Sequence, residues 1–322
     1  MDIKKRYRYI DIIKGITIIW VVMMHLEINP RWPDAATQMG IFFFLSGMFY
    51  KPKGQLEFIR RKYKSLIVPL LWFWLISFII MALKDGLFTR FINDFNGLIH
   101  NYTLSDFWNR YSYLRVNILW FLIALFVTNV FNNWLYTIII YHKRWVMIIV
   151  SSILYIAGSY LTGMKGEEPF KTIYDNPWFP ISPFMVYQLY FVIGYMAFNF
   201  LNKISLKVWV VSLIIYTLIF DYIPMPYLIR IVPYTVLLIG FSLKFFKKYE
   251  DVKAWDIFEF FGVNSIIIYL THMLIIYSPW CQVVIKEINY GRFYIFAIVM
   301  ISMLPLIYIF NKFIPAAVGK AK

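Results

Sequence analysis

Apolar residues fill long stretches of the chain, and shorter polar or charged segments separate these stretches. A transmembrane helix needs about 17–25 mostly apolar residues. Ten stretches approach this length, at roughly residues 9–26, 36–50, 65–83, 116–141, 145–162, 182–201, 208–223, 227–243, 257–279 and 293–311. The pattern therefore predicts an all-α membrane protein, a polytopic bundle of about ten transmembrane helices. No segment has the composition of a soluble domain, so we expect one integral membrane domain over residues 1–322.

The composition agrees with this interpretation. Of the 322 residues, 61% are hydrophobic and only 15% are charged, against about 45–50% and 25% in soluble domains. This balance excludes a secreted, cytosolic or disordered protein. Cys281 is the only cysteine, so an intrachain disulfide framework and a cysteine-rich metal site are excluded as well.

The charges predict how the bundle is oriented. The formal net charge is +15, and most of the 32 Lys and Arg residues fall on the side of the predicted bundle that holds both termini. An excess of Lys and Arg marks cytoplasmic segments, so we expect both termini in the cytoplasm and the protein in a bacterial cytoplasmic membrane. Anionic lipid headgroups or an anionic cofactor would meet this basic face. A nucleic-acid partner is not needed to explain the charge.

The first predicted span contains three ionisable residues, Asp11, Lys14 and His25. Ionisable groups inside a span are costly and point to a functional site by default. Lys14 and His25 are 11 residues apart, which on a helix is three turns plus about 20°, so they face the same way at roughly 16 Å along the axis. Asp11 lies one turn before Lys14 on nearly the same face. We expect a bundle interior or a water-filled cavity beside this stripe.

Two interpretations of the stripe remain open. In the structural one, Asp11 and Lys14 form an ion pair and His25 lies at the level of the outer headgroups. We favour this interpretation for Asp11. For His25 we favour a catalytic role, because Glu27 follows two residues later and histidine can take and return a proton near neutral pH. A hydroxyl group needs such a base before it attacks an acyl group.

These residues carry a resemblance to a known family. The run Tyr9–Gly15 followed by His25 resembles the opening motif of the acyltransferase family 3 membrane proteins, in which ten residues separate a basic residue from a histidine. Further segments resemble the motifs of this family in the same order, namely Phe42–Gly47, Arg60–Lys64 before Pro69, Leu119–Leu122 and Asn264–His272. The chain is most similar to the short members, such as fucose and capsule or exopolysaccharide O-acetyltransferases.

The resemblance implies transfer of an acyl group, usually acetyl, from cytoplasmic acyl-CoA to a sugar hydroxyl at or across the membrane. Acetyl-CoA is then the expected donor, and a polysaccharide or lipid-linked glycan is the expected acceptor. His25 would deprotonate the hydroxyl or carry the acyl group itself. Lys14 stands where arginine is common, so a point charge replaces a bidentate phosphate contact.

A basic cluster precedes the third predicted span. The segment Lys51–Lys64 holds six basic residues, and simple anchoring at the cytoplasmic surface explains Lys51 and Lys53. Arg60, Arg61 and Lys64 share a helix face just before the span. Since arginine is a natural partner of phosphate groups, we predict that these three residues, with Lys14, bind the phosphates of the donor.

The ninth predicted span offers a rival to His25. His272 lies in an otherwise apolar stretch, where it is either a second candidate for the catalytic histidine or a buried histidine bonded to a neighbouring helix. We favour His25. Asn264 and Ser265 begin the same span, and they would serve as a helix cap or as ligand contacts.

Two other residues have a packing explanation. Ser46 precedes Gly47, and small residues permit close helix packing in membranes, so we prefer this explanation to a nucleophilic serine. Trp120 would pack the bundle or line an acceptor groove.

No phosphate-binding glycine loop, dinucleotide fingerprint or paired metal-ligand cluster is found in the sequence, so no metal, ATP or NAD is expected.

Two other functions remain alternatives. Ten spans with ionisable residues also suit a transporter or flippase of lipid-linked sugars, although the Gly- or Pro-interrupted helices of repeated halves are not found. An acyltransferase with a non-glycan acceptor is the other alternative. The sequence does not predict the acceptor sugar, the acyl length or the oligomeric state.

Overall fold

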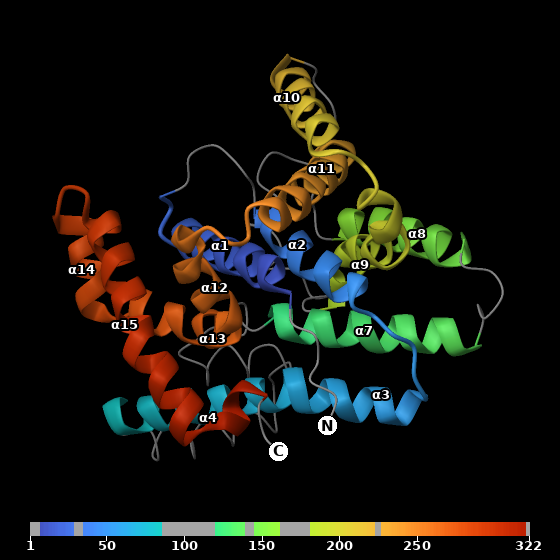
Figure 1. Cartoon of the computed structure of the whole chain (residues 1–322). Helices are drawn as coiled ribbons and strands as arrows, with labels where there is room; N and C mark the ends of the chain where they lie inside the picture. The colour runs from blue at the N-terminus through green and yellow to red at the C-terminus, as the bar shows by residue number, and fades with distance from the viewer. Residues whose placement is uncertain are drawn as a thin grey trace.

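The computed structural model describes residues 7–28, 35–85, 120–138, 145–161, 181–222 and 227–319, and within these residues every regular element is a helix (Figure 1). The first half contains α1 (Arg8–His25), α2 (Ala35–Met48), α3 (Gln55–Lys62), the π-helical η1 (Tyr63–Ile67), α4 (Val68–Asp85), α7 (Trp120–Ile138) and α8 (Trp145–Leu161). The second half contains α9 (Ile181–Leu201), α10 (Leu206–Tyr222), α11 (Tyr227–Lys248), η3 (Lys253–Trp255), α12 (Asp256–Val263), α13 (Ser265–Ile276), α14 (Pro279–Glu287), α15 (Gly291–Phe313) and η4 (Pro315–Val318).

Each of the ten predicted apolar stretches overlaps a helix, but the ninth prediction is wrong in form. Residues 257–279 do not make one straight helix, because α12 and α13 meet at Asn264 with a bend of 76°. The side chain of Asn264 donates to the carbonyl of Phe260 at 2.8 Å and accepts from Asn311 of α15 at 2.9 Å. A side chain that bonds to its own helix backbone competes with the helical hydrogen bonds, and here it accompanies a sharp break.

The number of membrane crossings stays a prediction. Among the described residues, two helices are long and apolar enough to cross a membrane, Pro183–Leu201 and Gly291–Phe313, and the bent pair α12–α13 adds a third if it is counted as one span. The first helix has a similar length, but Arg8, Asp11 and Lys14 interrupt its apolar surface. The cytoplasmic position of the termini also stays a prediction.

The interior is built from helix pairs that cross at close range. α1 packs along α12, and α2 packs along α9, which also contacts α7 and α8. A Cβ atom at Gly47 would lie 1.9 Å from the carbonyl oxygen of Phe191, and one at Gly194 would lie 2.1 Å from that of Phe44. The two backbones therefore touch where neither side has a side chain. This contact confirms the packing explanation of the Ser46-Gly47 pair as far as Gly47 is concerned.

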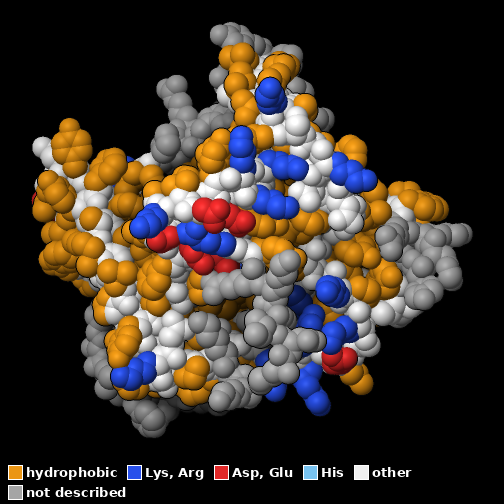
Figure 2. Space-filling view, in the orientation of Figure 1, with side chains coloured by type: hydrophobic (Ala, Val, Ile, Leu, Met, Phe, Trp, Pro, Cys, Tyr) orange, Lys and Arg blue, Asp and Glu red, His pale blue; other side chains and the backbone are white. Residues whose placement is uncertain are grey.

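The outer surface is divided between apolar and basic regions. Figure 2 shows Lys and Arg side chains gathered over the middle of one face, and hydrophobic side chains over α10 and over α14–α15. Several apolar residues on these helices are at least half accessible, for example Val211 and Leu218 on α10 and Ile301 and Leu304 on α15. Faces of this kind are covered by lipid in a membrane protein.

Candidate functional site at the α1–α13 seam

The site begins with the polar stripe on α1. Lys14 donates to the carboxylate of Asp11 at 3.1 Å, and the Asp11 side chain is only 8% exposed. The ion pair predicted between them is therefore present, one turn apart on the helix. It keeps a buried carboxylate beside a positive charge, which a buried acid requires.

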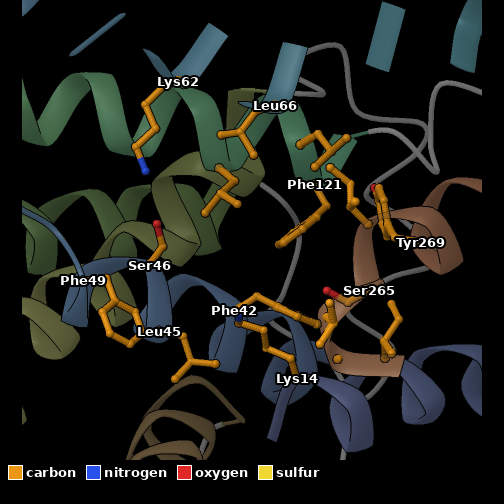
Figure 3. A pocket seen from close by; sticks show the side chains of 16 residues that line it. Lys14, Phe42, Leu45, Ser46, Phe49, Lys62, Leu66, Phe121, Ser265 and Tyr269 are labelled. Atoms are coloured by element: carbon orange, nitrogen blue, oxygen red, sulfur yellow. The ribbon is translucent and has the colours of Figure 1, made fainter. Parts of the chain in front are cut away.

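Lys14 also reaches a cavity of about 340 Å³ whose walls are mostly apolar. The cavity is lined by side chains from α1, α2, α3, η1, α7, α12 and α13, namely Lys14, Ile18, Phe42, Leu45, Ser46, Phe49, Lys62, Leu66, Phe121, Leu122, Leu125, Gly262, Val263, Ser265, Ile266 and Tyr269. Figure 3 shows Lys14 and Lys62 entering from opposite sides, with the amino group of Lys62 directed toward the hydroxyl of Ser46. Two ammonium groups therefore flank a space that is otherwise apolar.

The two candidate histidines are neighbours rather than alternatives. The ring centres of His25 on α1 and His272 on α13 are 5.2 Å apart. His272 is fully buried, and its Nδ1 lies 2.8 Å from the carbonyl oxygen of Ile268. The sequence separates the two histidines by 247 residues, and only the packing of α1 against α13 brings them together.

The histidines continue the line of the cavity. On α13, Ser265 and Tyr269 line the cavity, and His272 follows at the i+3 position after Tyr269, on the same helix face. The rings of Tyr269 and His272 are 6.3 Å apart. On α1, Lys14 and Ile18 line the cavity, and His25 follows on the same face at roughly 16 Å from Lys14 along the axis. A single seam between α1 and α13 therefore runs from the lysines to the histidines.

One residue of the basic cluster, Lys62, lines the cavity, and it is not among the three predicted to bind the donor. Arg60, Arg61 and Lys64 are exposed and do not line the cavity, whereas Lys62 does. Phe58 is the buried residue of α3, and Lys62 lies one turn later on the same face, with Nζ 5.6 Å from the centre of the Phe58 ring. The guanidinium carbon of Arg61 is also 5.6 Å from the centre of this ring, so Phe58 marks the face of both residues, and the cavity lining alone distinguishes Lys62.

The remaining candidate site residues lie in different surroundings, and Glu27 and Trp120 pair with other side chains. Glu27 forms an exposed ion pair with Arg292 of α15 at 2.5 Å, and the Trp120 ring stacks on Tyr187 with ring centres 5.5 Å apart. Asn264 precedes α13 but makes no capping bond with its side chain, so the helix-cap interpretation is wrong for Asn264. Ser265 lines the cavity.

Ser46 has a role that the sequence did not reveal. Its hydroxyl accepts from the amide of Asn129 on α7 at 3.1 Å, and both groups lie in the interior. Asn129 also donates to the carbonyl of Leu125, which lines the cavity. The pair fixes α2 against α7 on the wall that faces Lys62.

Comparison with known proteins identifies the family of the chain. The model of the acyltransferase domain of acyltransferase family 3 matches residues 7–312, which is nearly the whole chain. No curated protein and no solved structure shows significant similarity to the chain. The matched region includes the α1 stripe, the cavity and both histidines. The chain therefore belongs to acyltransferase family 3.

Proposed function

We propose that the protein transfers an acyl group, most simply acetyl, from cytoplasmic acyl-CoA to a hydroxyl group of a cell-surface or lipid-linked glycan. The single observation that supports this most strongly is the seam between α1 and α13. It leads from two lysines at an apolar cavity to a pair of histidines. The lysines and the apolar cavity suit the binding of an anionic donor with a long apolar arm. The pair of histidines suits proton transfer at the reacting carbonyl.

The cavity fits a part of the donor rather than all of it. Its volume of about 340 Å³ is near the lower end of ligand pockets, which hold about 300–1,000 Å³. Lys14 and Lys62 would bind phosphate groups as point charges, and the apolar walls would surround the extended arm. Arg60, Arg61 and Lys64, exposed on the same segment, would attract the nucleotide end from solution.

His25 would act at the far end of the seam. In one route, its free ring nitrogen removes the proton from the acceptor hydroxyl while the hydroxyl oxygen attacks the thioester carbonyl. The C–S bond then breaks, and His25 returns the proton to the departing thiolate. In the second route, a ring nitrogen of His25 attacks the thioester carbonyl, the C–S bond breaks, and the departing thiolate takes the other ring proton. The acceptor hydroxyl then attacks the acyl-imidazole, and its proton returns to His25 as the ester forms. Both routes need an unprotonated His25 at the start.

The test uses purified protein in nanodiscs with radiolabelled acetyl-CoA, with and without a glycan acceptor. We expect wild type to consume acetyl-CoA and His25→Ala to lose turnover while still inserting normally. Label that stays on the wild-type protein would favour the second route. If wild type neither binds nor consumes acetyl-CoA, the donor is wrong; if His25→Ala remains fully active, the assignment of His25 is wrong.

The acceptor needs a separate measurement. Mass spectrometry of surface glycans from a deletion strain and from the same strain complemented with the gene would show which acyl groups depend on the protein. We expect at least one O-acetyl group to disappear in the deletion strain and to return with the wild-type gene but not with His25→Ala. An unchanged glycan acylation profile would contradict a glycan acceptor.

A further inference from the structure

The hydrogen bond of His272 fixes where its proton lies. A carbonyl oxygen only accepts, so the contact between Nδ1 and the carbonyl of Ile268 at 2.8 Å requires that Nδ1 carry the hydrogen. In a neutral ring the other nitrogen, Nε2, then holds a lone pair. Nε2 is fully buried and has no hydrogen-bond partner among the described residues. Leaving a buried acceptor unpaired is unfavourable, so we expect a hydrogen-bond donor beside this atom.

His25 is placed to supply that donor. Each nitrogen of an imidazole lies about 1 Å from the ring centre, so rings with centres 5.2 Å apart can bring one nitrogen of each to about 3 Å, the length of a hydrogen bond. The rings are inclined by 42°, so the hydrogen bond requires a rotation of the His25 side chain. His25 is the last residue of α1, and its side chain is partly exposed.

We propose that His272 is a positioning residue for His25, and this proposal rests on the acyl-transfer function proposed above. Nε2 of His272 accepts a hydrogen bond from one ring N–H of His25. This contact fixes the tautomer of His25 and directs its remaining nitrogen, which holds the lone pair, toward the reacting groups. When His25 takes a proton from the acceptor hydroxyl, the same contact stabilises the imidazolium that forms.

A neutral hydrogen-bond partner for His25 suits the buried position of His272. A carboxylate would stabilise the imidazolium more strongly, but a buried charge is costly while His25 is neutral. A second imidazole provides an acceptor without that charge. Two adjacent imidazoles are also the beginning of a metal site, yet within the described residues no third His, Cys, Asp or Glu joins them.

The competing explanation is that His272 only packs α13. Thr271 provides a matched control, because it is the neighbouring buried polar residue on the same helix and donates to the carbonyl of Ile267 at 2.8 Å. Replacing Thr271 with valine removes a buried polar group from α13 without touching the histidine pair. An effect that belongs to general packing would follow both substitutions, and one that belongs to the pair would follow His272 alone.

The kinetic test compares His272→Gln, His272→Met and Thr271→Val in the nanodisc assay. The amide oxygen of glutamine lies near the position of Nε2 and can accept the same hydrogen bond, whereas methionine fills the space without this acceptor strength. We expect His272→Met to lower kcat about 100-fold, a typical share of general-base catalysis, with an unchanged KM for acetyl-CoA. His272→Gln should stay within about 10-fold of wild type, and Thr271→Val should match wild type. Equal kcat values for the glutamine and methionine variants would overturn the proposal.

A second readout does not depend on turnover. The chain has four histidines, so ¹⁵N labelling of histidine gives a spectrum that single substitutions can assign. We expect His272 to show a hydrogen on Nδ1, and His25 to show one tautomer in wild type and a mixture of tautomers in His272→Met. A His25 signal that is identical in both proteins would contradict the hydrogen bond. If wild type shows the expected tautomers but does not consume acetyl-CoA, the function proposed above fails while the contact stands.

Discussion

Gly15 of α1 and Gly262 of α12 face each other at the tightest helix crossing beside the cavity. A Cβ atom on Gly15 would lie 1.8 Å from the carbonyl oxygen of Phe258, and one on Gly262 would lie 1.7 Å from that of Asp11. The two backbones are therefore in direct contact, and the absence of side chains at both positions is what allows it. Because Gly262 itself lines the cavity, the same contact sets the distance between the α1 and α12 walls.

The first prediction concerns this crossing. Gly15→Ala forces α1 and α12 apart, since the clashing atoms belong to the backbone and cannot rotate away. Overpacking of this kind costs about 1–3 kcal/mol, and we expect a lower melting temperature in detergent for both Gly15→Ala and Gly262→Ala. Gly54→Ala is the control, because a Cβ atom at Gly54 meets nothing within 4 Å. A Gly15→Ala protein as stable as Gly54→Ala would show that the helices are not in contact.

The positions of most helices follow from the sequence because an apolar stretch of this length has few folded forms other than a helix. The break at Asn264 was missed because Asp256–Tyr277 contains no proline, and the polar pair Asn264-Ser265 was interpreted as the beginning of a span and not as a bend within one. The break depends on two hydrogen bonds of the Asn264 side chain, one of them to Asn311, 47 residues later. A contact of that kind is not visible in a local pattern.

The site was predicted in part for a similar reason. The face shared by Lys14 and His25 follows from helical periodicity, and this periodicity needs only one helix. The pairing of His25 with His272 depends on the packing of α1 against α13, which periodicity does not specify. Lys62 was not among the predicted donor contacts, because a pattern of basic residues does not show which of them reaches a cavity built by several other helices.

The second prediction separates the cavity lysine from its exposed neighbours. Lys62→Met removes an ammonium group from the cavity wall and keeps the length of the side chain. A hydrogen bond to a charged group contributes about 1.5–3 kcal/mol, so we expect KM for acetyl-CoA to rise about 10-fold or more with little change in kcat. Arg60→Met and Lys64→Met are matched controls on the exposed face and should change KM less. A larger effect at Arg60 than at Lys62 would place the phosphate contacts outside the cavity.

The third prediction concerns the segment that joins α2 to α3. The side chain of Asn133 on α7 accepts from the hydroxyl of Tyr50 at 3.2 Å and the amide of Lys53 at 3.1 Å, and it donates to the carbonyl of Lys53 at 2.9 Å and to Gln55 at 2.6 Å. This one side chain holds the segment against α7 and so positions α3 with Lys62. Asn133→Ala leaves these groups without their partner, which costs about 1–3 kcal/mol for each that remains buried.

We expect trypsin to cleave Asn133→Ala faster than wild type after Lys53, the one lysine of this segment that no proline follows, and KM for acetyl-CoA to rise. Asn132→Ala is the control, because Asn132 is equally buried on α7 but bonds to Gln188 of α9 at 3.0 Å and 2.8 Å instead. It should lose stability without faster cleavage after Lys53. Equal cleavage rates in the two variants would mean that Asn133 does not hold the segment.

The fourth prediction tests whether Glu27 acts in catalysis. Glu27 has a φ angle of 51°, a left-handed conformation that costs a non-glycine residue about 1–2 kcal/mol. Its ion pair with Arg292 is exposed on both sides, and such pairs contribute about 0.2–1 kcal/mol. Glu27→Gly gives up the pair and relieves the backbone, so we expect it to be at least as stable as wild type, whereas Glu27→Gln gives up the pair alone and should be slightly less stable. Because neither change touches the histidine pair, acetyl-CoA turnover should stay within about twofold of wild type for both variants. A loss of kcat in both, at unchanged stability, would instead make Glu27 a partner of His25 in the reaction.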